Sequence, residues 1–197
     1  MSTEPNIETH PLEPFLPPNA RLLMMGSFPP PKARWKMEFY YPNYQNDMWK
    51  IFGLVFFGNK EHFLDIANKN FKEQQIRDFL MEKGIAIFDT AYQIIRLKGN
   101  ASDKFLHIAQ ATDLNKLLQQ IPECNSIMTT GDKATDTLML SMPEHTEKPT
   151  IGHASKTYFA ERELTLYRMP SSSRAYPLAL EKKAEAYAQL FKEIGLL

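Results

Sequence analysis

The stretch ARLLMMGSFPP, residues 20–30, joins an apolar run to a loop in which the backbone has to turn. Residues 22–25 are all apolar, as in a short strand that is covered on both faces. Gly26 and Ser27 end this run, and the prolines that follow hold the chain rigid and extended. We therefore predict a buried strand whose carboxyl end opens into a shaped loop.

Three further strands are predicted along the chain, with helices between them. The strands are residues 85–90, 125–131 and 163–170, and the helices are residues 46–57, 69–84, 112–121, 132–142 and 178–195. This alternation is typical of a parallel sheet with helices on both faces. We predict the α/β class, as a three-layer α/β/α sandwich with a central, mainly parallel four-stranded sheet.

The composition fits one globular domain and limits its partners. Of the 197 residues, 43% are hydrophobic, and Lys+Arg and Asp+Glu both number 23, so binding to nucleic acid would need a local basic surface. The single cysteine, Cys124, excludes an intrachain disulfide and is compatible with a cytoplasmic protein. Neither a signal peptide nor a membrane span is recognisable, so no membrane partner is expected. We expect a monomer with an extended N-terminal arm, residues 1–20, and a single domain, residues 21–197.

The loop after the first strand is the richest functional candidate, because ligands of parallel sheets bind outside the carboxyl ends of the strands. Tyr41 and neighbouring aromatic residues could stack on a planar base. The cations Lys32, Arg34 and Lys36 could contact phosphates. An equally open interpretation is that these aromatic residues only pack the loop onto the sheet.

The loop after the last predicted strand, PSSSRAYP, also suits a phosphate backbone. It offers three hydroxyl groups and a guanidinium group, from Ser171, Ser172, Ser173 and Arg174. For serines alone, a helix cap is the simpler interpretation. Prolines on both sides of the hydroxyl groups favour a stiff, shaped turn, which a cap does not need.

Four motifs follow one another along the chain: GSFPP (26–30), YPNYQNDMWK (41–50), GIAIFDTAYQ (84–93) and MPSSSR (169–174). In this order they resemble the motifs of the uracil-DNA glycosylase superfamily, over roughly residues 20–195. The GSFP opening, the FYY aromatic residues and the last motif make the chain most similar to the hypoxanthine-DNA glycosylase branch.

This resemblance implies a monofunctional DNA N-glycosylase of base excision repair, which hydrolyses the N-glycosidic bond of a flipped hypoxanthine or uracil. DNA is then the partner, and no metal or redox cofactor is needed. Tyr41 would stack on the base, while the Asp89 carboxylate and the amides of residues 26–28 would contact its edge. The implied base pocket consists of Gly26, Ser27, Phe28, Tyr41 and Asp89.

Two positions depart from the motifs of the superfamily. Phe28 stands where uracil-removing relatives carry Asp or Asn, and Met169 stands where several relatives carry His or Asn. Phe28 cannot activate a water molecule. The hypoxanthine branch implies a downstream asparagine instead, for which Asn46 is the best match and Asn43 the alternative.

Other interpretations of these residues stay open. Asn46 could simply cap the following helix, and Asp89 could cap the end of its strand. Because Phe28 and Met169 remove the usual catalytic groups, a catalytically silent nucleic-acid-binding protein of the same fold is the alternative function. A small-molecule esterase or nucleotidase is disfavoured, because the chain has neither a Gly-x-Ser-x-Gly elbow nor a Walker-type phosphate loop.

Overall fold

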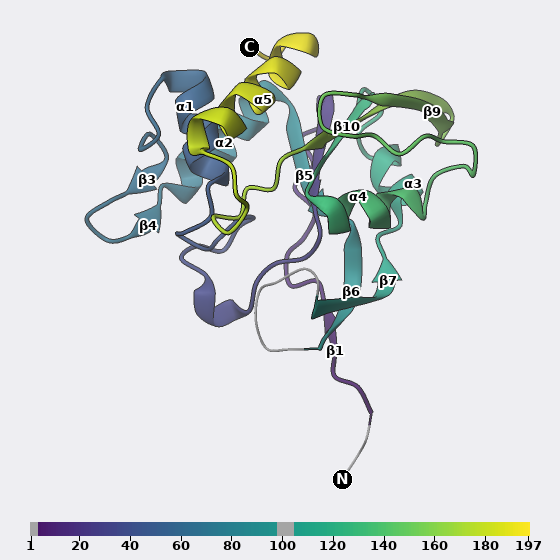
Figure 1. Cartoon of the computed structure of the whole chain (residues 1–197), viewed down its shortest axis with the longest axis horizontal. Helices are drawn as coiled ribbons and strands as arrows, with labels where there is room; N and C mark the ends of the chain where they lie inside the picture. Colours follow the sequence, from purple (N-terminus) through teal and green to yellow (C-terminus); the bar gives the residue numbers. More distant parts are fainter. Residues whose placement is uncertain (1–3, 98–104) are drawn as a thin grey trace.

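The computed structural model describes residues 4–97 and 105–197, and its centre is a five-stranded sheet (Figure 1). In spatial order the strands are β5 (Ile85–Asp89), β2 (Leu22–Gly26), β8 (Ser126–Thr130), β10 (Arg162–Met169) and β9 (Ser155–Phe159). The first four are parallel neighbours, and β9 is antiparallel to β10. The four parallel strands are those predicted. The prediction of a four-stranded sheet is wrong, because the sheet is five-stranded and mixed.

Helices cover both faces of this sheet. They are α1 (Met48–Phe57), α2 (Glu73–Lys83), α3 (Leu114–Gln119), α4 (Asp132–Met139) and α5 (Leu180–Glu193), with a short 3-10 helix η1 (Lys32–Arg34) in the first loop. Figure 1 places α1, α2 and α5 on one side of the sheet and α3 and α4 on the other. No helix in the described stretches is long and apolar enough to cross a membrane.

Two of the predicted helices end at a glycine. Gly58 and Gly84 follow α1 and α2 with φ of 64° and 73°, the left-handed backbone that glycine adopts without a Cβ penalty. The helix predicted from residue 69 begins instead at Glu73. Residues just before it form β4 (Asn70–Phe71), which pairs with β3 (Leu64–Asp65). A local strand pairing therefore replaces the first turn of the predicted helix.

A second, antiparallel sheet contains the N-terminal segment. Its order is β1 (Ile7–Thr9), β6 (Ala91–Arg96) and β7 (Leu106–Ala111). Phe15 also forms a backbone bridge to Ile87 at the edge of the central sheet. The N-terminal segment thus pairs with one sheet through residues 7–9 and with the other through Phe15; residues 1–3 are outside the described stretches. The division of the chain into an arm and one domain stays a prediction.

Candidate nucleic-acid-binding site

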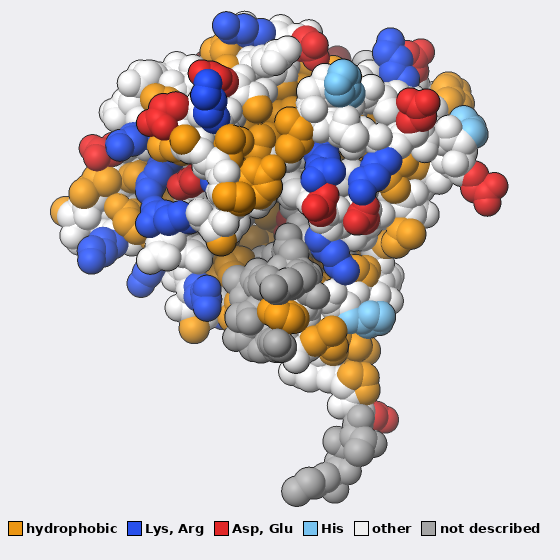
Figure 2. Space-filling view, viewed as in Figure 1, with side chains coloured by type: hydrophobic (Ala, Val, Ile, Leu, Met, Phe, Trp, Pro, Cys, Tyr) orange, Lys and Arg blue, Asp and Glu red, His pale blue; other side chains and the backbone are white. Residues whose placement is uncertain are grey.

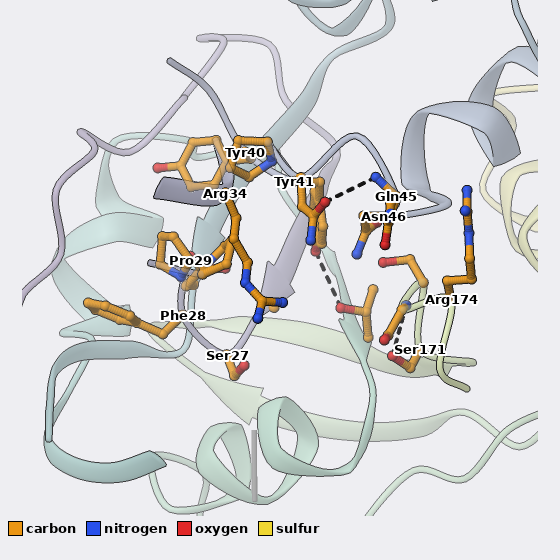
Figure 3. A pocket seen from close by; sticks show the side chains of 18 of the residues that line it. Ser27, Phe28, Pro29, Arg34, Tyr40, Tyr41, Gln45, Asn46, Ser171 and Arg174 are labelled. Carbon is orange, nitrogen blue, oxygen red and sulfur yellow. Dashed lines mark hydrogen bonds between the residues drawn. The ribbon is translucent and has the colours of Figure 1, made fainter. Parts of the chain in front are cut away.

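A cavity of about 480 Å³ opens at the carboxyl ends of the four parallel strands (Figure 3). Its lining is Gly26, Ser27, Phe28, Pro29, Pro30, Arg34, Tyr40, Tyr41, Pro42, Asn43, Gln45, Asn46, Asp89, Thr130, Ser171, Ser172, Ser173, Arg174 and Ala175. Each of the four parallel strands contributes its last residue or the loop that follows it. The cavity is of the size that small-molecule sites usually have.

Three polar side chains surround Gly26 at the floor of the cavity. A Cβ atom on Gly26 would lie 3.0 Å from Asp89 Oδ1, 3.1 Å from the Tyr41 hydroxyl oxygen and 3.6 Å from Thr130 Oγ1. The Tyr41 and Thr130 oxygens are themselves 3.3 Å apart, within hydrogen-bond distance. The missing side chain of Gly26 therefore leaves the space on which a carboxylate and two hydroxyl groups converge.

Tyr41 is held in an unusual backbone conformation beside this floor. Its φ of 53° lies in the left-handed region, which a residue with a large side chain adopts only when its surroundings impose it. Trp49 from α1 donates its ring N–H to the carbonyl oxygen of Tyr40 at 3.0 Å, and its ring meets that of Tyr41 edge-on at 6.2 Å. The buried Trp49 thus fixes the ring that was predicted to stack on a base.

Both candidate asparagines line the cavity, and both also shape their own backbone. Asn46 Oδ1 accepts a hydrogen bond from the Met48 N–H at 2.9 Å, and Asn43 Oδ1 accepts one from the Gln45 N–H at 3.0 Å. The alternative interpretation of Asn46 as a group that satisfies the start of α1 thus has a bond to support it. Because an amide oxygen has two lone pairs, the same Oδ1 retains capacity to accept from a water molecule.

The serine loop is folded by its own hydroxyl groups. Ser171 Oγ accepts from the Ser173 N–H at 3.2 Å, and Ser173 Oγ accepts from the Ala175 N–H at 3.3 Å. A hydroxyl group that accepts a backbone N–H still has its own O–H to donate. Ser172 differs, because it is buried and its carbonyl oxygen accepts from the Asp47 N–H at 2.9 Å. Ser171 and Ser173 are therefore the hydroxyl groups that best suit a phosphate.

A buried lysine connects the two opposite walls of the cavity. Lys183 from α5 is 1% exposed, and its Nζ donates to Asp47 Oδ2 at 3.0 Å and to the Ser173 carbonyl oxygen at 2.9 Å. The neighbouring Tyr187 donates its hydroxyl to the Pro170 carbonyl oxygen at 2.9 Å. Thus α5 holds both the serine loop and the residue that precedes α1. This role was not predicted, because both residues belong to a segment that was predicted only as an amphipathic helix.

The predicted cations divide into two groups. Arg34 and Arg174 line the cavity, whereas Lys32 and Lys36 do not. Lys32 pairs instead with Glu38 at 2.5 Å. Lys50 on α1 was not predicted; burial lowers its pKa, and the nearby positive charge of Arg174 lowers it further. Figure 2 shows Lys and Arg side chains gathered on the side of this face that carries η1 and α1.

Phe28 and Met169 have structural roles here. Phe28 points away from the space between Tyr41, Asn46 and Ser171 (Figure 3) and packs with the apolar cluster of β6 and β7. Met169 ends β10 and is 6% exposed within the main core. Phe28 is still among the residues that line the cavity, while its ring contributes to this apolar cluster.

Asp89 has a partner that no motif predicted. Its Oδ2 lies 2.7 Å from Nε2 of His10, which the N-terminal segment supplies. Among the described residues, the Asp89 side chain bonds to His10 and to no backbone amide, so no bond supports its interpretation as a strand-end cap. A histidine among scattered histidines carries no local sequence signal, so this pair became visible only in three dimensions. Among the described residues, the His10–Asp89 pair included, no group of three or more His, Cys, Asp and Glu could hold a metal ion.

Comparison with known proteins places the fold. No protein-family model matches the chain, and no curated protein sequence matches it. Among solved structures, the chain is similar to the solution NMR structure of a candidate uracil DNA glycosylase from Methanosarcina acetivorans. The TM-score is 0.64 with 19% sequence identity, over 96% of this chain and 99% of the other. The likeness covers nearly the whole of both chains, so this chain has the fold of that protein.

Proposed function

We propose that this protein is a DNA glycosylase that hydrolyses the N-glycosidic bond of a flipped, deaminated base, hypoxanthine or uracil. One observation carries the proposal: the ends of all four parallel strands meet in a cavity that combines an aromatic ring, a carboxylate, amides and guanidinium groups. The similar fold of a protein described as a candidate uracil DNA glycosylase supports it. Each of the four motifs of the sequence contributes at least one residue to the lining of this cavity.

The floor of the cavity offers the contacts that a flipped base needs. An aromatic face at Tyr41 would stack on the base, at roughly 1–3 kcal/mol per base. Asp89 would accept a hydrogen bond from a ring N–H, and the amides of residues 26–28 would lie at the edge of the base. Because Gly26 has no side chain, the base could approach the backbone closely.

Hydrolysis would use one water molecule. Its oxygen forms the new bond to C1′ of the deoxyribose, the bond from C1′ to the base nitrogen breaks, and the base leaves with that electron pair and takes up a proton. Asn46 would position the water through Oδ1, with Asn43 as the alternative. Positive charge that develops on the sugar in the transition state would be stabilised by the DNA phosphates.

The rim of the cavity would hold the DNA backbone. Arg34 and Arg174 come from opposite walls, and the hydroxyl groups of Ser171 and Ser173 lie beside Arg174. Such groups contact phosphate and sugar and fix the position of the strand without reading its sequence. Lys32 and Lys36 would contact phosphates further from the flipped base.

An excision assay tests the proposal directly. Duplexes and single strands that carry one hypoxanthine, uracil, xanthine or ethenoadenine are incubated with excess protein and then cleaved with alkali at abasic sites. We expect cleavage of a hypoxanthine or uracil substrate and none of the undamaged duplex. Binding to DNA without cleavage of any substrate would favour the alternative function, a catalytically silent nucleic-acid-binding protein. A protein that neither binds nor cleaves any of these DNAs would contradict both functions.

A further inference from the structure

A buried histidine and carboxylate lie behind the floor of the cavity. The side chains of His10 and Asp89 are 0% and 7% exposed, and Nε2 and Oδ2 are 2.7 Å apart. Burial of two such groups is costly unless they bond to each other. The glycosidic hydrolysis described above needs neither His10 nor the segment that carries it, so the pair calls for another explanation.

The N-terminal segment fixes both the position and the tautomer of His10. Pairing of β1 with β6 brings His10 to the end of β5. The backbone N–H of His10 donates to the Tyr92 carbonyl oxygen at 2.8 Å. The Leu12 N–H donates to Nδ1 at 3.1 Å, so Nδ1 acts as an acceptor and the ring proton is on Nε2. The ring also packs against Phe88, with centroids 4.5 Å apart. Nε2–H therefore donates to Asp89.

This bond gives the two oxygens of Asp89 different roles. Oδ2 is occupied by His10, whereas Oδ1 has no hydrogen-bond partner among the described residues and lies 3.0 Å from where a Cβ atom of Gly26 would be. The hydroxyl groups of Tyr41 and Thr130 approach the same point. A single fixed acceptor thus stands beside two groups that are able to donate.

We propose that His10 is a positioning residue that holds Asp89 so that the cavity accepts bases with a ring N–H next to a carbonyl group. Oδ1 accepts from the ring N–H, and a hydroxyl group of Tyr41 or Thr130 donates to the carbonyl oxygen. Deamination creates this pair of groups: N1 of adenine and N3 of cytosine are acceptors, but the same atoms of hypoxanthine and uracil carry hydrogen. The inference rests on the proposed function and names its substrate class.

Fixation of the carboxylate matters because adenine also carries a donor, its amino group. A carboxylate that could move would follow the amino group, and a hydroxyl group would rotate to donate to N1. With His10 holding Oδ2, Oδ1 stays at the position of the ring nitrogen, where it meets the lone pair of adenine N1. The N-terminal segment would in this way contribute selectivity against adenine and cytosine, the bases from which hypoxanthine and uracil arise. Guanine and thymine carry the same pair of groups, so this contact does not exclude them.

Binding to uncleavable DNA tests the inference apart from catalysis. The probes are duplexes with one 2′-fluorinated deoxyinosine or one 2′-fluorinated deoxyadenosine, since the fluorine opposes positive charge on the sugar and so retains the base. The measured quantity is the ratio of the two dissociation constants. We expect the wild-type protein to favour inosine, and His10→Leu to reduce this preference about tenfold, the effect of losing one hydrogen bond to a charged group. His10→Gln, which keeps an N–H at a similar reach, should largely restore the preference.

Two further variants separate positioning from folding. In an Asp89→Ala background, His10→Leu should change the preference no further, because the two side chains act as one unit. His107→Leu, at an exposed histidine on β7, should leave the preference at its wild-type value. A His10→Leu protein that is folded and keeps the full preference would overturn the inference. A wild-type protein that excises bases but binds both probes equally would also overturn the inference, while the proposed glycosylase function would still stand. A preference without excision supports the inference and replaces the enzyme with the silent binder.

Discussion

Lys183 and Asp47 are 136 positions apart in the chain, yet their side chains form a buried ion pair at 3.0 Å. The same lysine binds the Ser173 carbonyl oxygen, and the Asp47 N–H binds the Ser172 carbonyl oxygen. Asp47 immediately precedes α1, but its carboxylate bonds to none of the helix amides. The carboxylate thus helps to hold two walls of the cavity together and does not cap its own helix.

Removal of the lysine charge should destabilise the protein. Lys183→Met keeps an unbranched apolar chain but leaves the buried Asp47 carboxylate without its cation, which typically costs about 3–5 kcal/mol. Unfolding in urea, followed by tryptophan fluorescence, measures the loss. The double variant Lys183→Met with Asp47→Leu should recover part of the stability, since no unpaired charge is left. If Lys183→Met unfolds at the same urea midpoint as the wild-type protein, the ion pair contributes nothing to stability.

The Asn46→Ala variant tests the proposed catalytic group. If Asn46 positions the water, single-turnover excision should fall by about 10²-fold or more. Stability should fall by only about 1 kcal/mol, since one bond at the helix start is lost. Asn46→Asp should keep that bond, and its carboxylate could act as a base, so activity should persist or shift towards uracil.

Asn43→Ala is the control for the alternative assignment. Asn43 makes the same kind of bond to its own backbone, to the Gln45 N–H. A large fall in excision with Asn43→Ala and none with Asn46→Ala would move the catalytic role to Asn43. If neither variant slows excision per folded molecule, Asp89 becomes the group to test.

Tyr41 should matter more for the flipped base than for DNA in general. Tyr41→Ala removes a stacking surface worth roughly 1–3 kcal/mol, while phosphate contacts persist. Fluorescence anisotropy should show weaker binding to damaged duplex and little change for undamaged duplex. Tyr41→Phe retains the ring and loses only the hydroxyl near Thr130, so stacking should survive. Equal losses for both duplexes would favour the packing role.

Gly26→Ala should fill the floor of the cavity. The new methyl group would lie 3.0 Å from Asp89 Oδ1 and 3.1 Å from the Tyr41 hydroxyl oxygen, and one of them has to move. We expect a folded protein, by circular dichroism, whose excision rate is lower by roughly tenfold, the effect of one lost hydrogen bond. An unchanged rate would place the base elsewhere in the cavity.

Binding to DNA should depend on salt, with a shallow slope. The chain is formally neutral, and the rim provides Arg34 and Arg174, with Lys32 and Lys36 beyond it. Each neutralised phosphate contributes about 0.9 to the slope of log affinity against log salt. Arg174→Ala should therefore lower the slope by about 0.9.

A lysine elsewhere on the surface provides the control for this slope. Lys156 pairs with Glu163 on the β9–β10 hairpin, at 3.6 Å. Lys156→Ala should leave the slope unchanged, because a contact with DNA is expected only near the cavity. Affinity that stays constant between low and moderate salt would contradict the phosphate contacts altogether.

Strands β2 and β5 of the parallel core were predictable because they are short apolar runs with clear ends. Residues 22–26 and 85–89 are buried throughout in the structure, as a strand covered on both faces requires. By contrast, β9 and β7 alternate or mix exposed and buried residues and contain lysine, glutamine and histidine. Such edge strands form because a neighbour offers hydrogen bonds, and the local sequence carries little sign of that.

The residues of the candidate site likewise divide into those that the local sequence predicts and those that it does not. Residues that end or follow a recognisable strand, such as Gly26, Asp89 and Ser171, were predicted because topology brings strand ends together. His10 and Lys183 were not, because each acts through a partner far away in the sequence. Thr130 lies at a strand end that the sequence did identify, but a single threonine has no distinctive signal. The catalytic and base-reading roles themselves stay predictions.

The pairing of distant segments also has a consequence for the order of events during synthesis. A nascent chain that ends before α5 contains all the aromatic residues of the first loop and all four parallel strands, yet lacks Lys183 and Tyr187. Without them the serine loop loses its bonds to α5, and a buried Asp47 has no cation. The cavity would therefore close only after the last helix emerges from the ribosome, and contacts over such long separations form slowly. An incomplete chain would then have little grip on DNA.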